Sequence, residues 1–132
     1  MKLKPFIMSD RIILGLNDGS QEDVLRQLIQ PLVDAGNLIS DPDKFIHDLL
    51  EREKQVTTVM ENGVAFPHTR SEAVNRLCLT VGVAEPDGIH FNPENDAVSR
   101  LFFCIGVPAF APTAHIPILQ SLASFAREEK RV

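Results

Sequence analysis

Two segments of this 132-residue chain, residues 77–84 and 101–107, are apolar almost throughout. Each has the length of a strand rather than of a helix, and a proline-containing turn or loop signal follows each of them. A strand that is apolar on both faces must be covered on both faces. The pair therefore predicts a β-sheet with a layer of structure on each side. A chain of this length fits a single domain, 1–132.

Helical periodicity predicts the covering layers. The first helix should begin at Ser20, which forms a near capping box with Asp23, and should end at Gly36. Pro31 lies inside this helix and should kink or split it, because proline has no backbone N–H. The dipeptide Asp41-Pro42 marks the start of a second helix, with Asp as the cap and Pro at the first helical position.

A third helix and three short strands complete the expected elements. The apolar stripe of the helix consists of Ile118, Leu119, Leu122, Ala123, Phe125 and Ala126. Residues 12–16 and 64–66 are short apolar runs, and residues 89–91 are read as a brief edge strand. Helices mixed with buried strands predict an α/β fold class, with a sheet covered on both sides.

Composition and charge exclude several classes of function. The formal net charge is −5 and no basic stripe is present, so nucleic-acid binding is not expected. Cys78 and Cys104 lie inside apolar runs without a disulfide pattern, which favours a reducing compartment. The chain shows no secretory signal and no segment long enough to span a bilayer. We therefore expect a cytoplasmic protein that is not inserted into a membrane.

The dipeptide Pro67-His68 is the most informative candidate for chemistry. The apolar run Val64-Ala65-Phe66 leads into it, and a proline restricts both its own backbone and that of the residue before it. The chain should therefore present one imidazole just beyond the end of a strand. Such an imidazole can act as a nucleophile, a base or a metal ligand. From spacing alone, an exposed loop histidine is an equally good interpretation.

The other histidines differ in what their positions indicate. His47 and His90 are expected to be exposed or structural, and His115 taken alone is typical of a histidine that caps a helix. His68 and His115, however, each follow the end of a predicted strand, so the fold could bring them into one crevice. The helix N-terminus beside His115 would add N–H groups and a positive dipole end, which favour an anion.

Motifs for a bound cofactor are missing from the sequence. It contains no P-loop, no dinucleotide fingerprint and no G-x-S-x-G motif. A zinc site needs three or four ligands at recognisable spacing, so a metal or hydrolase site built on His68 and His115 is only a minor alternative. We expect no cofactor and no metal. Any phosphoryl group must then arrive on a donor, for example on a phosphoprotein.

The segment Gly63-Val64-Ala65-Phe66-Pro67-His68 resembles the phosphorylation-site motif of enzyme IIA of the sugar phosphotransferase system. The type is the mannitol/fructose one, which includes the nitrogen-regulatory branch. The resemblance spans most of the chain. Its other elements are in register: Arg52-Glu53, Thr58, Asn62-Gly63, and His115 followed by Leu119 and Leu122.

This resemblance implies a fold and a set of roles. The fold would be a mixed β-sheet flanked by helices on both sides. His68 would be the phosphorylated nucleophile, His115 would stabilise the transferring group, and Arg52 and Thr58 would line or support the site. The donor would be the histidine-containing phosphocarrier protein, and the acceptor would be enzyme IIB.

The sequence departs from the family pattern at a few positions. Val59 and Glu61 stand where relatives commonly have glycine, and Thr69 follows the histidine where the residue is usually small or glycine. Phe66 is bulkier than the usual aliphatic residue. These departures leave open a second hypothesis, a regulatory, nitrogen-type module that controls a partner protein. Family domains tend to continue with another helix, so we expect the domain to be short at its C-terminus.

Overall fold

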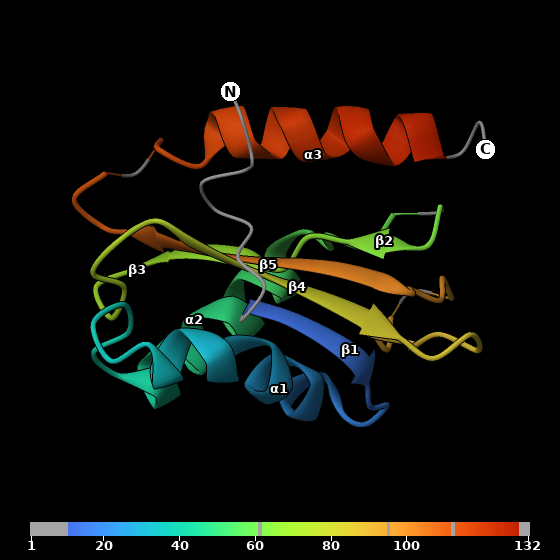
Figure 1. The fold of residues 1–132 in the computed structure, drawn as a ribbon, viewed down its shortest axis with the longest axis horizontal. Coiled ribbons are helices and arrows are strands. Elements are labelled where there is room, and N and C mark those ends of the chain that lie inside the picture. Colours follow the sequence, from blue (N-terminus) through green and yellow to red (C-terminus); the bar gives the residue numbers. More distant parts are fainter. Residues whose placement is uncertain (1–10, 61, 95, 112, 130–132) are drawn as a thin grey trace.

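The computed structural model describes residues 11–60, 62–94, 96–111 and 113–129, and Figure 1 shows how they are arranged. Within these residues, three helices and five strands follow one another. Their order is β1 (Ile12–Leu16), α1 (Gln21–Asp34), α2 (Pro42–Gln55), β2 (Val64–Ala65), β3 (His68–Ser71), β4 (Cys78–Ala84), β5 (Leu101–Pro108) and α3 (Ile116–Glu129).

The strands form one mixed sheet in the order β1-β4-β5-β2, with β3 also paired to β5. The two apolar strands, β4 and β5, are antiparallel neighbours at its centre. β1 runs parallel to β4, and both β2 and β3 run parallel to β5. β2 and β3 therefore occupy consecutive stretches of the same edge of β5, and residues 66–67 separate them.

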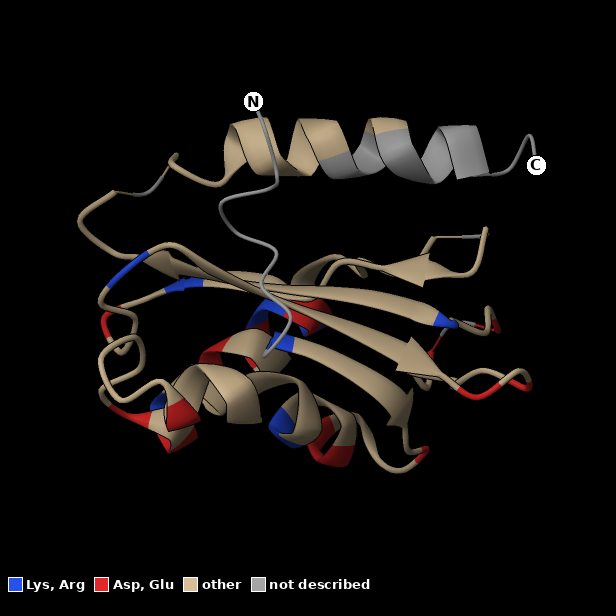
Figure 2. Ribbon diagram, viewed as in Figure 1, with Lys and Arg blue, Asp and Glu red and all other residues tan. Residues whose placement is uncertain are grey.

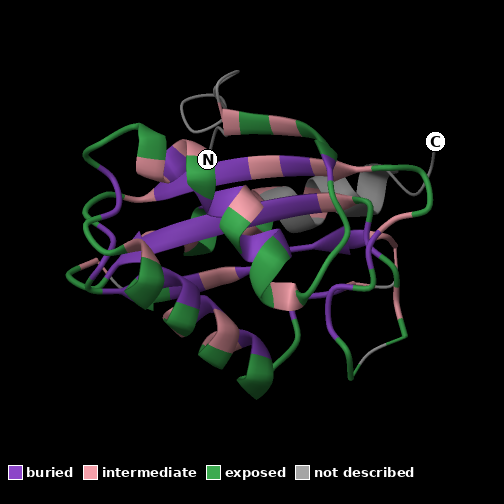
Figure 3. Cartoon of the chain, turned by 90° about the horizontal axis from the view of Figure 1, so that it is seen from below, coloured by how far each residue is buried: buried purple, intermediate pink, exposed green. Residues whose placement is uncertain are grey.

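Helices cover both faces of the sheet, as Figure 1 shows. α1 and α2 pack on one face over a core that includes Phe45, Cys78 and Phe102. α3 lies over the other face, where Ile118 packs with Phe103 and Ile105. The buried residues, coloured purple in Figure 3, are therefore concentrated in the strands between the two helical layers. The predicted α/β fold with a mixed, doubly covered sheet is confirmed.

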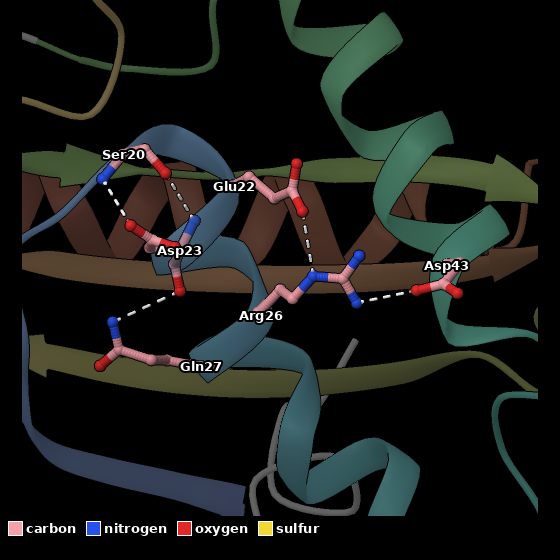
Figure 4. A network of polar contacts seen from close by, with 6 residues as sticks. All are labelled: Ser20, Glu22, Asp23, Arg26, Gln27 and Asp43. Atoms are coloured by element: carbon pink, nitrogen blue, oxygen red, sulfur yellow. Dashed lines mark hydrogen bonds and ion pairs between the residues drawn. The ribbon is translucent and has the colours of Figure 1, made fainter.

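The start of α1 is fixed by the capping box that the sequence predicts (Figure 4). Ser20 Oγ accepts the Asp23 N–H at 3.1 Å, and the Asp23 carboxylate accepts the Ser20 N–H at 3.1 Å. Arg26, one turn further on, contacts Glu22 on its own helix and Asp43 of α2 at 2.9 Å. These contacts set the first helix against the second.

Pro31 does not split α1, which continues to Asp34. Proline removes one backbone donor, but Leu28 and Leu32 on either side of it are fully buried against the sheet. Packing of this apolar stripe against the core therefore keeps α1 a single continuous helix despite the proline. Gly36 follows with a positive φ of 84°, as expected for the residue after a helix C-terminus.

The prediction of an edge strand at residues 89–91 was wrong, because Ile89 makes only an isolated bridge to Ser99. His68 lies just beyond the end of β2, as predicted, but it begins the strand β3 and is not part of a loop. The sequence of β3 has no apolar run, so its extended form comes from pairing with β5 and not from local preference.

The chain contains two free cysteines among its described residues, and both are buried, as predicted. Burial raises the pKa of the Cys78 thiol to about 11 and also raises the pKa of Cys104. No described helix combines the length and the apolar character needed to cross a membrane. The side chains of Leu122, Ala123, Phe125 and Ala126, and the whole of Glu61, lie outside the described residues.

Candidate active site

His68 and His115 line the same cleft, which has a volume of about 700 Å³. The centroids of their rings are 5.6 Å apart and the ring planes are tilted by 35°. His68 comes from the first position of β3, and His115 immediately precedes α3. The sheet edge and the start of the last helix thus bring together two imidazoles that are far apart in the sequence.

The backbone around Pro67 sets the position of His68. The Pro67 carbonyl accepts the Ile105 N–H at 2.9 Å, and His68 then pairs in register with Ile105. The chain therefore leaves β2 and rejoins the same edge of β5 after only two residues. Phe66 is buried within this turn, and its ring stacks on Phe103 at a centroid distance of 5.6 Å.

The ring of His68 has two nitrogens in different surroundings. Its Nδ1 lies 2.7 Å from the carbonyl oxygen of Phe66. A carbonyl oxygen only accepts hydrogen bonds, so this contact places the proton on Nδ1. Nε2 of the neutral ring then carries the free lone pair. The contact fixes both the tautomer and the orientation of the ring.

Burial lowers the pKa of His68 below its ordinary value and is the main cause of the shift. The positive charge of Arg52 lowers it further, while the Phe66 hydrogen bond and the charge of Glu53 oppose the change. The pKa of His115 is also lowered, first by burial and then by His68, Arg70 and Arg52. Both imidazoles are therefore biased toward the neutral form at neutral pH.

His115 stands at the N-terminal end of α3, and its carbonyl accepts the Leu119 N–H at 2.9 Å. The Nδ1 atom of its ring is buried and, within the part of the chain that the structure describes, has no hydrogen-bond partner. A buried polar atom without a partner is costly, so this nitrogen is suited to a group that enters the cleft. The helix N-terminus beside it favours an anionic group.

Arg52 and Thr58 differ in their relation to the cleft. Arg52 lines it, and its Nη1 donates to the Val56 carbonyl at 3.0 Å. Thr58 is buried behind the cleft, where its carbonyl accepts the Phe66 N–H at 3.2 Å. Arg52 thus faces the site directly, whereas Thr58 supports the backbone that carries His68.

The sequence reasoning missed two cations that line the cleft, Lys44 and Arg70. Arg70 lies two residues after His68 on β3, and alternate residues of a strand share a face. This signal was hidden because the strand itself was not predicted. The cleft also has acidic side chains from α2, where Figure 2 shows both signs of charge, and Asp48 there accepts a 2.6 Å hydrogen bond from Ser71.

The positions that depart from the family pattern are partly visible. Val59 is buried and forms an isolated bridge with Ala65, so it lies in the backbone that supports the site. Thr69 lines the cleft with little exposure, and its hydroxyl donates to the Arg70 carbonyl at 3.2 Å.

His47 and His90 are exposed. Within the described ranges, no three His, Cys, Asp or Glu side chains are grouped to hold a metal ion.

Comparison with known proteins identifies the family. The model of the family described as phosphoenolpyruvate-dependent sugar phosphotransferase system, EIIA 2, matches residues 5–132. The chain belongs to this enzyme IIA family. It is 35% identical over 114 residues to the fructose-specific EIIA component of Haloferax volcanii, which covers 85% of this chain and 72% of the relative.

Some relatives are much longer than this chain. The chain is 30% identical over 123 residues to the mannitol-specific EIICBA component of Escherichia coli, covering 92% of this chain. It spans only 18% of that relative's length. This chain therefore corresponds to one segment of a multidomain relative and to most of a single-component relative.

Solved structures of the enzyme IIA family have the same fold. The mannitol IIA of Escherichia coli matches with a TM-score of 0.72 and 26% identity, over 89% of this chain and 81% of that one. A complex of mannitol enzyme IIA with phosphorylated enzyme IIB from the same organism matches with a TM-score of 0.71 and 26% identity, over 89% of this chain and 79% of that one. A nitrogen regulatory protein IIA from Neisseria meningitidis shares the fold. It matches with a TM-score of 0.75 and 22% identity, over 97% of this chain and 84% of that one.

Proposed function

We propose that this protein is a phosphocarrier that accepts a phosphoryl group on Nε2 of His68 and passes it to enzyme IIB. The donor is the histidine-containing phosphocarrier protein of the sugar phosphotransferase system. The observation that carries the proposal is the 2.7 Å contact from Nδ1 of His68 to the Phe66 carbonyl, inside a cleft shared with His115. This contact leaves Nε2 as a neutral nucleophile of defined direction.

The transfer exchanges one nitrogen–phosphorus bond for another. The Nε2 lone pair of His68 attacks the phosphorus atom in line with the bond to the donor's histidine nitrogen. That bond breaks, and its electron pair returns to the donor's imidazole. His68 keeps its proton on Nδ1, where the Phe66 carbonyl stabilises the positive character that the ring gains. In the second transfer a nucleophile of enzyme IIB attacks the phosphorus atom, the bond to Nε2 of His68 breaks, and its electron pair returns to the His68 ring.

Charge around the phosphoryl oxygens is balanced by groups that line the cleft. Arg52, Arg70 and His115 line the cleft together with His68. Phosphoryl transfer depends on positioning and on stabilisation of charge spread over the equatorial oxygens. We assign Arg52 and His115 to that stabilisation, and Thr58 to the support of the His68 backbone. The group arrives already bonded to the donor, so no nucleotide or metal is needed.

Exposed apolar side chains next to the cleft support docking of a partner protein. Val56, Phe110 and Ile116 are 63%, 79% and 43% exposed. Phe110 and Ile116 are sequence neighbours of the cleft residues Ala109 and His115. Aromatic and apolar contacts of this kind are enriched in protein interfaces. We place the exchange in the cytoplasm, because the two free cysteines fit a reducing compartment.

The test is phosphorylation of purified protein with phosphoenolpyruvate, enzyme I and the phosphocarrier protein. The wild-type chain should gain one acid-labile phosphate, and His68→Ala should gain none. His115→Ala should still be labelled, but more slowly. The matched control is His47→Ala, an exposed histidine on α2, which should behave as the wild type. A wild-type chain that stays unlabelled with competent partners would contradict the proposal.

A regulatory module remains the second candidate. One observation favours it: Val59 and Thr69 are both buried, and the family usually has a smaller residue at each of these positions. In that case His68 would still accept a phosphoryl group, but no enzyme IIB would receive it. Incubation of the phosphorylated protein with mannitol-type and fructose-type enzyme IIB separates the two functions. Transfer to either one supports the carrier, and retention together with capture of a non-transport partner supports the regulator.

A further inference from the structure

Glu53 is a buried carboxylate that takes no direct part in the cleft. It lies in the last turn of α2, is only 3% exposed, and directly follows Arg52. The side chains that line the cleft in the described part of the chain include Arg52 but not Glu53. A buried charge needs hydrogen-bond partners to offset the loss of hydration. The partners of Glu53 show what it holds.

Three hydrogen bonds join Glu53 to the two threonines that follow the helix. Oε2 accepts the Thr57 hydroxyl at 2.9 Å and the Thr58 N–H at 2.7 Å, and Oε1 accepts the Thr58 hydroxyl at 2.6 Å. Hydrogen bonds to a charged acceptor are shorter and stronger than neutral ones. The carboxylate therefore clamps both the backbone and the side chain of Thr58.

The clamped segment is paired with the backbone that precedes His68. The Thr58 carbonyl accepts the Phe66 N–H at 3.2 Å, and the Met60 N–H donates to the Val64 carbonyl at 2.8 Å. Phe66 then presents its own carbonyl to Nδ1 of His68 at 2.7 Å. A continuous path of hydrogen bonds thus runs from Glu53 through Thr58 and Phe66 to the imidazole.

We propose that Glu53 is a positioning residue for phosphoryl transfer, which fixes the Nδ1–H tautomer of His68 through Thr58 and the Phe66 carbonyl. This inference rests on the proposed function, because it concerns the nucleophile of that same reaction. The charge of Glu53 also acts on His68, whose pKa it raises against the larger effect of burial.

The first variant is Glu53→Gln, which keeps the shape of the side chain but removes its charge and replaces one acceptor with a donor. The amide oxygen can still accept the Thr57 hydroxyl and the Thr58 N–H, but the Thr58 hydroxyl must turn to accept from the amide nitrogen, and all three bonds lose the charge that strengthens them. We expect the rate of His68 phosphorylation to fall roughly tenfold to a hundredfold, as small losses of alignment do in enzymes. In protein labelled with ¹⁵N in its histidine rings, NMR should show a mixture of the two His68 tautomers in place of one.

A matched pair of variants at Thr58 tests the same path of hydrogen bonds if Glu53→Gln does not fold. Thr58→Val removes the hydroxyl that contacts Oε1 and should reproduce the slow rate and the mixed tautomer. Thr58→Ser retains the hydroxyl and should restore both. Leu32→Ala, a fully buried site in α1 away from this path, controls for lost stability and should leave the tautomer unchanged.

Each result decides the inference. Slow transfer together with a mixed tautomer supports it. A wild-type rate in Glu53→Gln, or a slow rate with an unchanged tautomer, would overturn it, because the carboxylate would then be structural only. The tautomer is measured on the unphosphorylated protein. The positioning role is therefore tested even if the wild type fails to accept a phosphoryl group, which would count against the proposed function instead.

Discussion

His68 carries its two ring nitrogens in unlike surroundings, and this difference determines what the residue can do. One nitrogen is tied to the Phe66 carbonyl, and the ring lines a cleft that also contains His115 and Arg52. Burial and the Arg52 charge lower the pKa of the ring, which favours its neutral form. A histidine in this state is a nucleophile at neutral pH, and protonation would remove its lone pair.

The lowered pKa of His68 predicts the pH dependence of phosphorylation. A histidine in water has a pKa of about 6.5, so an unperturbed nucleophile would already lose activity near that pH. The rate of His68 phosphorylation should stay constant as the pH falls through this ordinary histidine pKa, and should decrease only at lower pH. Initial rates of phosphorylation, measured with a saturating donor at a series of pH values, give this profile. Loss of half the rate above the ordinary histidine pKa would contradict it.

The same shift predicts a loss of stability in acid. His68 has a lower pKa in the folded chain than in the unfolded chain, so the unfolded chain binds more protons between the two values. Folding stability therefore decreases as the pH falls from about 6.5 to the folded-state pKa, and is unaffected by this group above that window. The free energy of unfolding in urea, measured above and below the window, should fall less in His68→Gln than in the wild type.

At the scale of the elements, the cap of α1 contributes stability without touching the site. The Ser20 hydroxyl accepts the Asp23 N–H, which would otherwise have no partner within the helix. Ser20→Ala should lower the free energy of unfolding by about 1 kcal/mol, the usual effect of losing such a cap. Phosphorylation of His68 should be unchanged, because α1 lies away from the cleft. A change in the phosphorylation rate larger than the loss of folded protein would contradict this separation.

The contact between α1 and β4 depends on a glycine. A Cβ atom on Gly82 would lie 2.6 Å from Leu28 Cδ2 and 3.1 Å from Leu16 Cδ2. Both leucines are buried, so neither can move freely out of the way. Gly82→Ala should reduce the free energy of unfolding by roughly 1–3 kcal/mol, as overpacking of a core does. Chemical denaturation measures this, and an unchanged midpoint would mean that α1 shifts more easily than its packing indicates.

Local signals in the sequence were sufficient for the elements that depend on local interactions. The caps at Ser20 and Asp41 and the two apolar strands were predicted correctly, because capping and burial leave direct marks in the sequence. β3 was missed because His68–Ser71 has a polar sequence and is extended only through pairing with β5. Strand formation of this kind depends on a neighbour that is distant in the sequence.

At the scale of the whole molecule, the site combines residues that the fold brings together from separate elements. Pro67 and the apolar run before it indicated His68, and the predicted strand ends before His68 and His115 indicated that the two could share one crevice, which the ring contact confirms. Arg70 was missed together with its strand. Glu53 was noted only beside Arg52 in the family pattern, since nothing in the local sequence shows that this carboxylate is buried and bonded to threonines.

The relation of this fold to phosphoryl transfer is most directly tested by locating the phosphoryl group. The protein is labelled with ¹⁵N in its histidine rings and phosphorylated with phosphoenolpyruvate, enzyme I and the phosphocarrier protein. Coupling between ³¹P and ¹⁵N then identifies the bonded nitrogen. The account predicts a single phosphoryl group on Nε2 of His68. A phosphoryl group on His115, or on Nδ1 of His68, would contradict it.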